Sequence, residues 1–330
     1  LHGTSVRAAF GGRLDGRFAP SLRPPFPTAG LALPRRVLDA TLLAAARAAG
    51  VEVLEGTRLE APLRDGDRIV GAALRADAGT FTLRAGVVVG ADGLRSRLAR
   101  TLGGRRHGWP RRVAFVAHVA GVPGLDGAAE MHVGPHGYVG LNPIGTDLAN
   151  VALVLPAADA AAARGRPADF FHEQLARFPE VRERVDRRRV VREVLVTGPF
   201  AAWSSRVTAP GALLVGDAAD FFDPFTGEGI CSALRGAELA AAALGAPGHD
   251  ARRLDGALAA YRRARWRTFA GKWAVERLIG TAMAWPALFD HAVRRIGRRR
   301  GMADTLVGVT GDLVPARHVL NPLFLSRMVV

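Results

Sequence analysis

The amino-acid sequence predicts an α/β protein in which an antiparallel β-sheet is inserted into a parallel α/β domain and a helical tail follows. Three observations lead to this fold class. Two strand–turn–helix segments, at 87–100 and 213–244, begin with the continuous apolar runs that are typical of buried parallel strands. Residues 111–155 instead alternate in short, spaced strands, as in an antiparallel sheet. From 251 to 300 the pattern is helical, with arginines on the polar faces.

The first part of the chain should supply one helix and one strand. Residues 1–34 are rich in Gly and Pro, and 21–30 (SLRPPFPTAG) should form a loop. The alanine-rich segment 35–50 should be a helix, because it ends on a glycine that suits a helix C-terminus. The next segment, 51–56 (VEVLEG), alternates like a strand.

Further strands should follow before the insert. Asp-Gly at 65–66 and Ala-Gly at 78–79 are turn signals that separate two or three strands, and the valine run 87–89 should be a buried parallel strand. Within the insert, 167–178 should be a helix with Pro at its N-terminal turn. Apolar residues at 212–215 should form another parallel strand.

These elements divide the chain into three regions. The α/β domain is expected at 1–110 and 199–245, interrupted by the antiparallel insert at 111–198. Residues 246–330 should form the helical tail. A chain of 330 residues is long enough for two domains with an ample core.

The composition is that of a globular protein. Hydrophobic residues make up 49% of the chain, yet no uninterrupted apolar run reaches the ~18–20 residues of a membrane-spanning helix. The start lacks the long apolar core of a secretory signal. The single cysteine, Cys231, excludes an intramolecular disulfide framework and fits a reducing compartment, so we expect a cytoplasmic protein. Cys231 itself should be a small buried residue.

The net charge of +15 invites a nucleic-acid-binding hypothesis, but the distribution of charge argues against it. Lys272 is the only lysine, so 44 of the 45 basic residues are arginines, scattered along the whole chain. Such scatter indicates a compositional bias rather than a nucleic-acid-binding stripe. The exception, 294–300 (RRIGRRR), is either a solvated helix end or a site for an anionic membrane surface or acidic partner.

The most informative stretch is 213–230 (LLVGDAADFFDPFTGEGI). An aspartate, Asp217, lies at the carboxyl end of a strand, where ligands bind in open α/β sheets. A turn at Asp223-Pro224 follows, and the next helix opens on Thr-Gly-Glu-Gly. Glycines let a backbone approach a ligand closely, and free N–H groups at a helix N-terminus favour an electron-rich partner. A capped surface loop would not need all of these features.

Two shorter segments carry further candidates. In 87–100 (VVVGADGLRSRLAR), Asp92 either accepts hydrogen bonds from ligand hydroxyls or caps the following helix. Arg35 stands four residues before Asp39 at the start of the first helix. An arginine there can pair with a phosphate or lie along a ring system, although such residues are more often simply exposed.

Together and in this order, the segments resemble the glutathione-reductase-type flavoproteins of the aromatic-hydroxylase lineage. GADGLRS around Asp92 resembles their Asp-Gly fingerprint, and RRVLD at 35–39 resembles the motif that precedes it. GDAADFFDPFTGEGI resembles the Gly-Asp fingerprint of geranylgeranyl reductases and flavin-dependent halogenases. GYVGLNPIG at 137–145 resembles a strand of the substrate sheet, and the similarity covers most of 31–245.

The resemblance implies an FAD-binding, Rossmann-like domain with an inserted substrate domain, and it implies a role for each matched residue. Asp217 would hydrogen-bond the ribityl chain, and the backbone from Gly227 to Ile230 would face the pyrimidine end of the flavin. A helix N-terminus there would stabilise the negative charge of the reduced ring. The implied cofactor-binding residues are Arg35, Asp92, Gly93, Gly216, Asp217, Pro224, Gly227, Gly229 and Ile230. Asp92 and Gly93 would border the pyrophosphate and the path of NAD(P)H, and Pro224 would line the substrate side.

One element of the resembled family is missing from the sequence. These flavoproteins open with a strand–GxGxxG–helix unit, but Gly11-Gly12 has no apolar strand before it and no helix after it. We therefore expect an FAD-binding domain that is incomplete at its N-terminus, with the ADP-binding unit outside this sequence.

The resemblance predicts an FAD-dependent oxidoreductase, reduced by NAD(P)H, that acts on a hydrophobic small molecule by hydroxylation or by alkene reduction. A non-catalytic remnant or binding protein is the alternative, because the first unit is missing. No catalytic acid or base stands out, and the histidines at 118, 132 and 136 are not at metal-ligand spacing, so no metal is expected. Trp285 and Leu288, followed by the arginine run, suggest peripheral membrane contact or a buried amphipathic helix. No feature indicates the oligomeric state.

Overall fold

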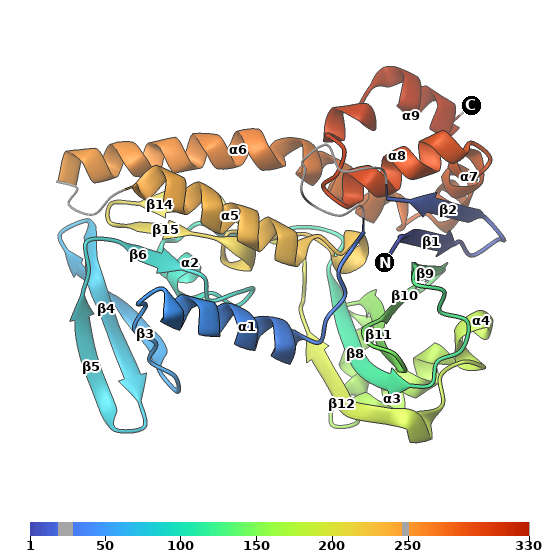
Figure 1. The fold of residues 1–330 in the computed structure, drawn as a ribbon, viewed down its shortest axis with the longest axis horizontal. Coiled ribbons are helices and arrows are strands. Elements are labelled where there is room, and N and C mark those ends of the chain that lie inside the picture. The colour runs from blue at the N-terminus through green and yellow to red at the C-terminus, as the bar shows by residue number, and fades with distance from the viewer. Residues whose placement is uncertain (19–28, 246–250, 330) are drawn as a thin grey trace.

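The computed structural model describes residues 1–18, 29–245 and 251–329. The described chain forms one seven-stranded sheet and three three-stranded sheets, together with α-helices. In Figure 1 the seven-stranded sheet lies on the right, and the long helix α6 (Ala251–Ala282) runs above α5 (Gly229–Leu244) toward the C-terminal helices. This arrangement confirms the predicted fold class, an α/β domain with an inserted, largely antiparallel sheet and a helical tail.

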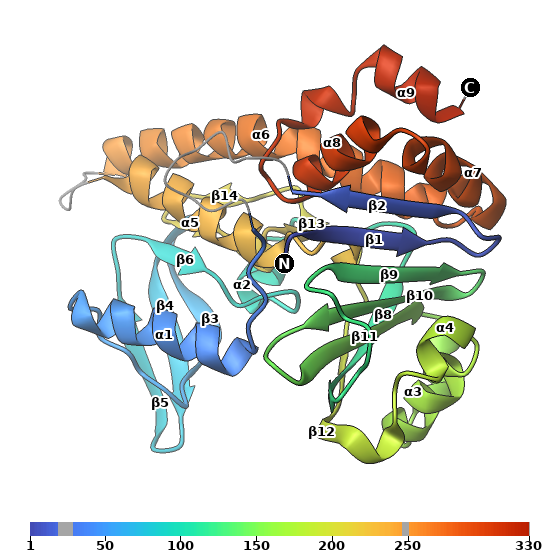
Figure 2. The same cartoon turned by 45° about the vertical axis from the view of Figure 1, so that its right-hand side comes forward.

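The seven-stranded sheet is the inserted one, and its strand order is β12-β8-β11-β10-β9-β1-β2. Its strands are β1 (Gly3–Arg7), β2 (Arg13–Arg17), β8 (Arg112–Ala120), β9 (Ala129–Gly134), β10 (Gly137–Pro143), β11 (Leu148–Pro156) and β12 (Val190–Thr197). One face packs on α3 (Pro167–Leu175) and α4 (Pro179–Arg182), where Phe115 and Phe171 are fully buried. The other face packs on helices of the tail, as Figure 2 shows for the edge formed by β1 and β2.

The N-terminal residues form a hairpin, for which no strands were predicted from the sequence. β1 pairs in parallel with β9, with Thr4 opposite Ala129, and β2 completes the edge of the inserted sheet. Val6 and Leu14 are 7% and 2% exposed and belong to the core of that sheet. Residues 1–18 therefore belong with the insert and not with the α/β domain at 1–110. Most of the predicted loop at 21–30 lies outside the described residues.

The α/β part contains one parallel strand pair. β6 (Val88–Gly90) runs parallel to β15 (Ala212–Leu214), which also pairs with β14 (Thr208–Ala209). The predicted parallel strand at 87–89 is thus confirmed, but its predicted burial is wrong. Val89 is 44% exposed, because β6 is the edge strand of this sheet among the described residues.

A second antiparallel sheet consists of β3 (Arg58–Asp65), β4 (Arg68–Ala76) and β5 (Gly79–Arg84). Its two turns fall at the predicted glycines, Gly66 and Gly79, with φ of 55° and 124°. The predicted strand at 51–56 does not form: this segment is irregular, with Val51 and Leu54 exposed. Its alternating pattern finds no partner strand in the described chain.

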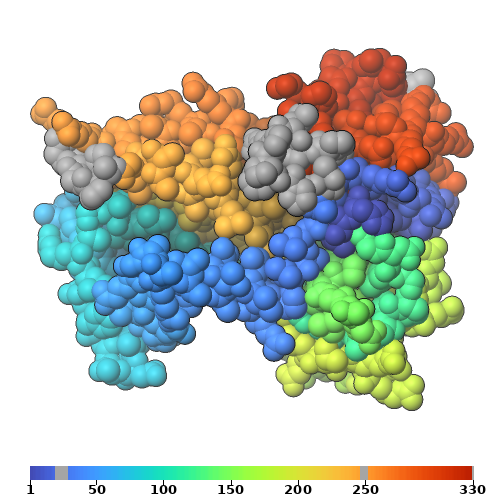
Figure 3. Space-filling model, in the orientation of Figure 1, coloured from blue at the N-terminus to red at the C-terminus, as the bar shows by residue number. Residues whose placement is uncertain are grey.

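The predicted first helix is confirmed as α1 (Arg35–Ala48), and Gly50 beyond its C-terminus has φ of 84°. None of its residues is buried, and Val37 and Leu42 are 46% and 44% exposed. Figure 3 shows α1 lying on the surface, next to the β3–β5 sheet. The helix is therefore held by few apolar contacts within the described chain.

The remaining elements complete the path of the chain. They are α2 (Arg97–Thr101), β7 (Arg105–His107), β13 (Ala202–Ser204), β16 (Asp220–Phe221), α7 (Pro286–Gly297), α8 (Arg300–Thr310) and α9 (Pro322–Val329). β7, β13 and β16 form a small sheet. From 251 to 329 the chain is mainly helical, as predicted, whereas 246–250 lie outside the described residues. No helix in the described ranges is long and apolar enough to cross a membrane.

Candidate functional site

The two predicted fingerprint loops lie side by side because β6 pairs with β15. Gly90, at the end of β6, is opposite Leu214, at the end of β15, so both loops leave the same edge of the sheet. Arg105 on β7 joins them: its guanidinium donates hydrogen bonds to the Ala218 carbonyl at 3.1 Å and to the Leu94 carbonyl at 2.6 Å. Arg105 has no distinctive signal in the sequence and was not predicted.

Asp217 lies in a short turn directly after β15. Gly216 has φ of 54°, and a Cβ added there would lie 3.1 Å from the Cβ of Ala233, so the turn packs closely on α5. Burial raises the pKa of the Asp217 carboxyl and the charge of Asp220 raises it further, whereas Arg35 lowers it. Within the described chain the carboxyl group makes no hydrogen bond or ion pair, so it can accept a hydrogen bond from a ligand hydroxyl.

Asp223 organises the turn at Pro224. One carboxylate oxygen accepts hydrogen bonds from the Phe225 amide at 3.0 Å and from the Tyr138 hydroxyl at 2.7 Å. The other oxygen forms an ion pair with Arg112 at 2.6 Å, and both side chains of this pair are buried. Tyr138, on β10, also packs edge-to-face on Phe225 at 5.2 Å. The turn is thus anchored to the inserted sheet by a fully paired carboxylate.

The entrance of α5 presents open backbone. Gly227 has φ of 73°, and nothing lies within 4 Å of a Cβ added there. The amide N–H groups of Gly229, Ile230 and Cys231 find no acceptor within the described chain, and no side chain caps the helix. Ile230 is 40% exposed, and Cys231 is exposed rather than buried as predicted, because it points away from the core at this entrance. Free donors and open space fit the electron-rich pyrimidine end of a flavin.

Asp92 serves as a helix cap in this structure. Its Oδ2 accepts hydrogen bonds from the amides of Arg97 at 2.7 Å and Leu98 at 3.3 Å, at the start of α2. Gly93 has φ of 73° and open space around a Cβ position. The capping role, one of the two predicted for Asp92, is therefore realised through Oδ2, and the open backbone at Gly93 lies beside it.

Arg35 is the first residue of α1. Its Nε lies 2.9 Å from Oδ1 of Asp39, one turn on, and its side chain is 64% exposed. Its charge nevertheless acts on Asp217, whose pKa it lowers. Arg35 therefore faces the side of the molecule on which the Gly-Asp loop opens, although its own partner is a surface carboxylate.

Three of the four acidic residues of the 216–230 segment, all except Asp217, are held by buried cations that the motif analysis did not single out. The described chain has three buried arginine or lysine side chains, and each of them pairs with one of these acids. The pairs are Arg112 with Asp223, Arg265 with Asp220, and Lys272 with Glu228. The cations come from β8 and α6, more than 40 residues away along the chain, and so no local pattern identifies them.

A small polar cavity of about 30 Å³ lies between this segment and α6. Such a volume holds one or two water molecules. Its lining includes Asp217, Gly229, Lys272 and Glu276. Glu276 has no ion-pair partner within the described chain, and burial raises its pKa to about 8, with the charges of Glu228 and Asp220 adding to the shift.

A larger cavity of about 520 Å³ opens at the end of the inserted sheet that contacts the Asp223 turn. Its lining combines Trp109, Val133 and Met283 with Tyr138, whose hydroxyl donates to Asp223. Trp285 lies near its rim, packed edge-to-face on Trp109 at 5.9 Å, and both rings are more than half exposed. The volume and the apolar lining suit a hydrophobic small molecule.

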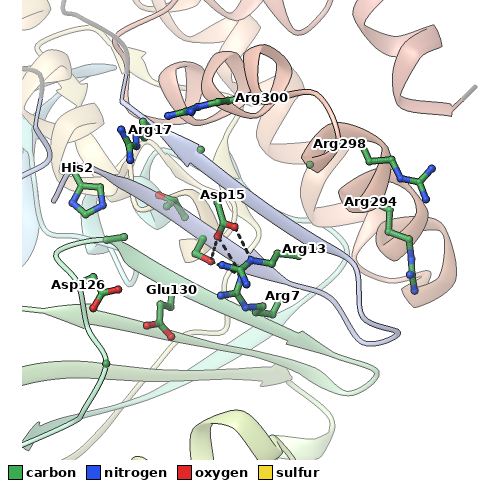
Figure 4. A pocket seen from close by; sticks show the side chains of 16 residues that line it. His2, Arg7, Arg13, Asp15, Arg17, Asp126, Glu130, Arg294, Arg298 and Arg300 are labelled. Atoms are coloured by element: carbon green, nitrogen blue, oxygen red, sulfur yellow. Dashed lines mark hydrogen bonds and ion pairs between the residues drawn. The ribbon is translucent and has the colours of Figure 1, made fainter.

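Another hollow, of about 770 Å³, lies elsewhere and includes none of the predicted site residues. It is bounded by β1, β2, the segment before β9 and the junction of α7 with α8. Figure 4 shows Arg7 and Arg13 turned toward Asp15, with which both form ion pairs, while Arg298 points away. Six arginines and three acidic residues line this hollow, and neither fingerprint loop contributes to it.

The paired loops, the open helix entrance and the inserted sheet define the class: an α/β protein with a ligand site at the ends of its parallel strands and a second sheet inserted into it. A family model described as "FAD binding domain" matches residues 23–272. The chain therefore belongs to the FAD-binding domain family, and the resemblance drawn from the fingerprint loops is confirmed.

Curated relatives carry the name digeranylgeranylglycerophospholipid reductase. The chain is 31% identical over 218 residues to the digeranylgeranylglycerophospholipid reductase of Methanosarcina mazei, covering 64% of this chain and 52% of the relative. It is 31% identical over 258 residues to the enzyme of that name from Methanothrix thermoacetophila, covering 76% of this chain and 63% of the relative. The chain thus spans between half and two-thirds of the length of these relatives.

Solved structures share the fold. The flavin-dependent halogenase CmlS superposes with a TM-score of 0.76 at 22% identity, covering 97% of this chain and 64% of CmlS. PqsL from Pseudomonas aeruginosa, described as a probable FAD-dependent monooxygenase, superposes with a TM-score of 0.66 at 25% identity, covering 88% of this chain and 80% of PqsL. The fold is thus that of FAD-dependent enzymes.

Proposed function

We propose that the protein acts as an FAD-dependent oxidoreductase on a hydrophobic, prenyl-type small molecule and reduces a carbon–carbon double bond, with NAD(P)H as the source of electrons. The observation that carries the proposal is the convergence of the unpaired Asp217 carboxyl and the open α5 entrance on one edge of the β6–β15 pair. The names of the curated relatives support reduction. Hydroxylation is the second candidate, supported by the likeness to PqsL.

Different residues of the chain would bind the cofactor and the substrate. FAD, when bound, supplies the two-electron chemistry. The Asp217 carboxyl would accept a hydrogen bond from the ribityl chain, and the free amides from Gly229 onward would stabilise negative charge on the ring. Pro224 and the 520 Å³ cavity beyond Tyr138 would hold the substrate and exclude water. No side chain at this edge is assigned as the acid that completes alkene reduction.

Replacing Asp217 with alanine should weaken flavin binding about ten- to a hundredfold while the fold is retained, because one charge-assisted hydrogen bond is lost. The measurement is the visible flavin absorbance of the purified variant, with circular dichroism to follow the fold. Asp126→Ala, at an exposed position in the remote hollow, is the control and should leave flavin binding unchanged. Full flavin occupancy in Asp217→Ala would contradict the assignment, and a wild-type chain that binds no flavin would favour the non-catalytic binding protein.

Peripheral membrane contact would bring a prenyl-type substrate to the rim of the cavity. Trp109, Trp285 and Leu288 are each more than half exposed there, and α7 continues from Trp285 into the arginine run. We expect the protein to float with anionic vesicles of phosphatidylglycerol and phosphatidylcholine, and Trp285→Ala to reduce the bound fraction at least severalfold. Trp266→Ala, which removes a more exposed tryptophan from α6, should have no effect. Absence of the wild-type protein from the vesicle fraction would rule out this contact.

A further inference from the structure

Lys272 stands apart from every other cation of the chain. It is the only lysine among 45 basic residues, and it is one of the three that are buried within the described ranges, with 9% of its surface exposed. An ammonium group is a compact point charge, whereas a guanidinium is a planar fork that needs more room. In a chain that otherwise uses arginine, the buried lysine marks a place where the compact cation fits between two acids.

The ammonium group bridges two segments that are distant in sequence. Nζ lies 3.5 Å from Oε2 of Glu228, at the entrance of α5, and 3.0 Å from Oδ1 of Asp312, just after α8. Neither Nζ nor Glu228 Oε2 makes a hydrogen bond of good geometry in the described chain, so the attraction depends on charge. The backbone of Asp312 has a φ of 59°, in the left-handed region. This conformation costs energy for a residue other than glycine and persists where contacts with the surrounding structure stabilise it.

The bridge lies next to a helix start that has no side-chain cap. No side chain caps α5, and its first amides are unpaired within the described chain. Glu228, the residue before the helix, has a buried side chain directed to α6. Because a buried carboxylate that loses its partner is strongly disfavoured, the position of Glu228, and with it the adjoining backbone, depends on Lys272.

We propose that Lys272 is a positioning residue: by bridging Glu228 and Asp312 it fixes the backbone of Gly227–Ile230, which forms the entrance of α5. The consequence for the cofactor rests on the proposed function, since this is the backbone that would face the flavin. The consequence for backbone order does not, and can be measured without any cofactor.

The test is hydrogen exchange, followed by mass spectrometry, on the full chain and its Lys272→Met variant. The peptide covering 223–235 should exchange at least tenfold faster in the variant, because the entrance of α5 opens locally without its bridge. Leu175→Ala, which removes a buried side chain from α3 on the far face of the inserted sheet, is the matched control. It should lower overall stability without selectively accelerating exchange in this peptide. Equal acceleration in the two variants would overturn the proposal.

A second variant keeps the test decisive if Lys272→Met does not fold. Asp312→Asn retains a residue that tolerates positive φ but removes the charge at the other end of the bridge. It should accelerate exchange of the same peptide severalfold, and no change would overturn the proposal. In a parallel arm, Lys272→Met should weaken FAD binding, measured by quenching of flavin fluorescence, while Leu175→Ala should not. A wild-type chain that binds no FAD would contradict the proposed function and leave the exchange result valid.

Discussion

Replacing Glu276 with glutamine should stabilise the protein at pH 8 by about 4 kcal/mol and hardly at all at pH 4.5. Burial raises the pKa of this carboxyl from 4.5 to about 8, and the negative charges of Glu228 and Asp220 contribute, while Lys272 opposes the shift. The folded protein therefore keeps the proton through a range in which the unfolded chain has lost it.

The sign of the pH dependence follows from this difference in bound protons. Between pH 4.5 and about 8 the folded state binds one proton more than the unfolded state at this position. The free energy of unfolding therefore falls by about 1.4 kcal/mol for each unit by which the pH rises. Glutamine, which is neutral at every pH, removes that slope. Urea denaturation of both proteins at the two pH values measures the effect. Glu238→Gln, on the exposed face of α5, is the control and should shift the unfolding free energy by less than about 0.5 kcal/mol.

An equal effect of Glu276→Gln at both pH values would show that Glu276 is ionised in the folded protein. The raised pKa belongs to a group of acids, in and next to the 216–230 segment, that outnumber the cations paired with them. Arg265 and Lys272 pair with Asp220 and Glu228, and no cation pairs with Glu276 within the described chain. Keeping Glu276 protonated relieves this excess of negative charge at a lower free-energy cost than burying a further carboxylate.

The elements that could be predicted from the sequence are those with a strong local signal. The α1 helix, the turns of the β3–β5 sheet, the strands of the insert and the α5 entrance each follow from short-range patterns, and the structure contains them. The β1–β2 hairpin was missed because its stability comes from pairing with β9, more than 100 residues later. The segment 51–56 alternates like a strand but has no partner, and without cross-strand pairing alternation alone does not hold an extended chain.

The candidate site likewise contains residues with a local sequence signal and residues without one. Asp217 and the glycines of the α5 entrance could be predicted, because a strand end followed by a glycine-rich helix start is a local pattern with a physical meaning. The residues that hold this loop could not: Arg112 and Lys272 lie 111 and 44 residues from the acids they pair with. Only the rarity of lysine in this chain could have drawn attention to Lys272.

The pair of Arg112 and Asp223 should be worth about 3 kcal/mol or more in a double-mutant cycle built from Arg112→Met and Asp223→Asn. Both side chains are at most 6% exposed, and their atoms are 2.6 Å apart. Either single change leaves the other group buried without its partner, while asparagine keeps an acceptor for the Phe225 amide. The double variant removes both charges together and should recover most of the lost stability.

The surface pair of Arg13 and Asp15 provides a control with the same separation of charged atoms. Its atoms are also 2.6 Å apart, but the side chains are 63% and 52% exposed. Because water screens exposed charges, the corresponding cycle with Arg13→Met and Asp15→Asn should give a coupling below about 1 kcal/mol. Chemical denaturation of the four variants of each cycle measures both couplings. Similar coupling free energies in the two cycles would mean that water reaches the Asp223 turn. The turn would then not be rigidly anchored to the inserted sheet. A large difference would show that burial gives the Asp223 pair its strength, and that the turn leading into the α5 entrance is fixed by the sheet that would bind the substrate.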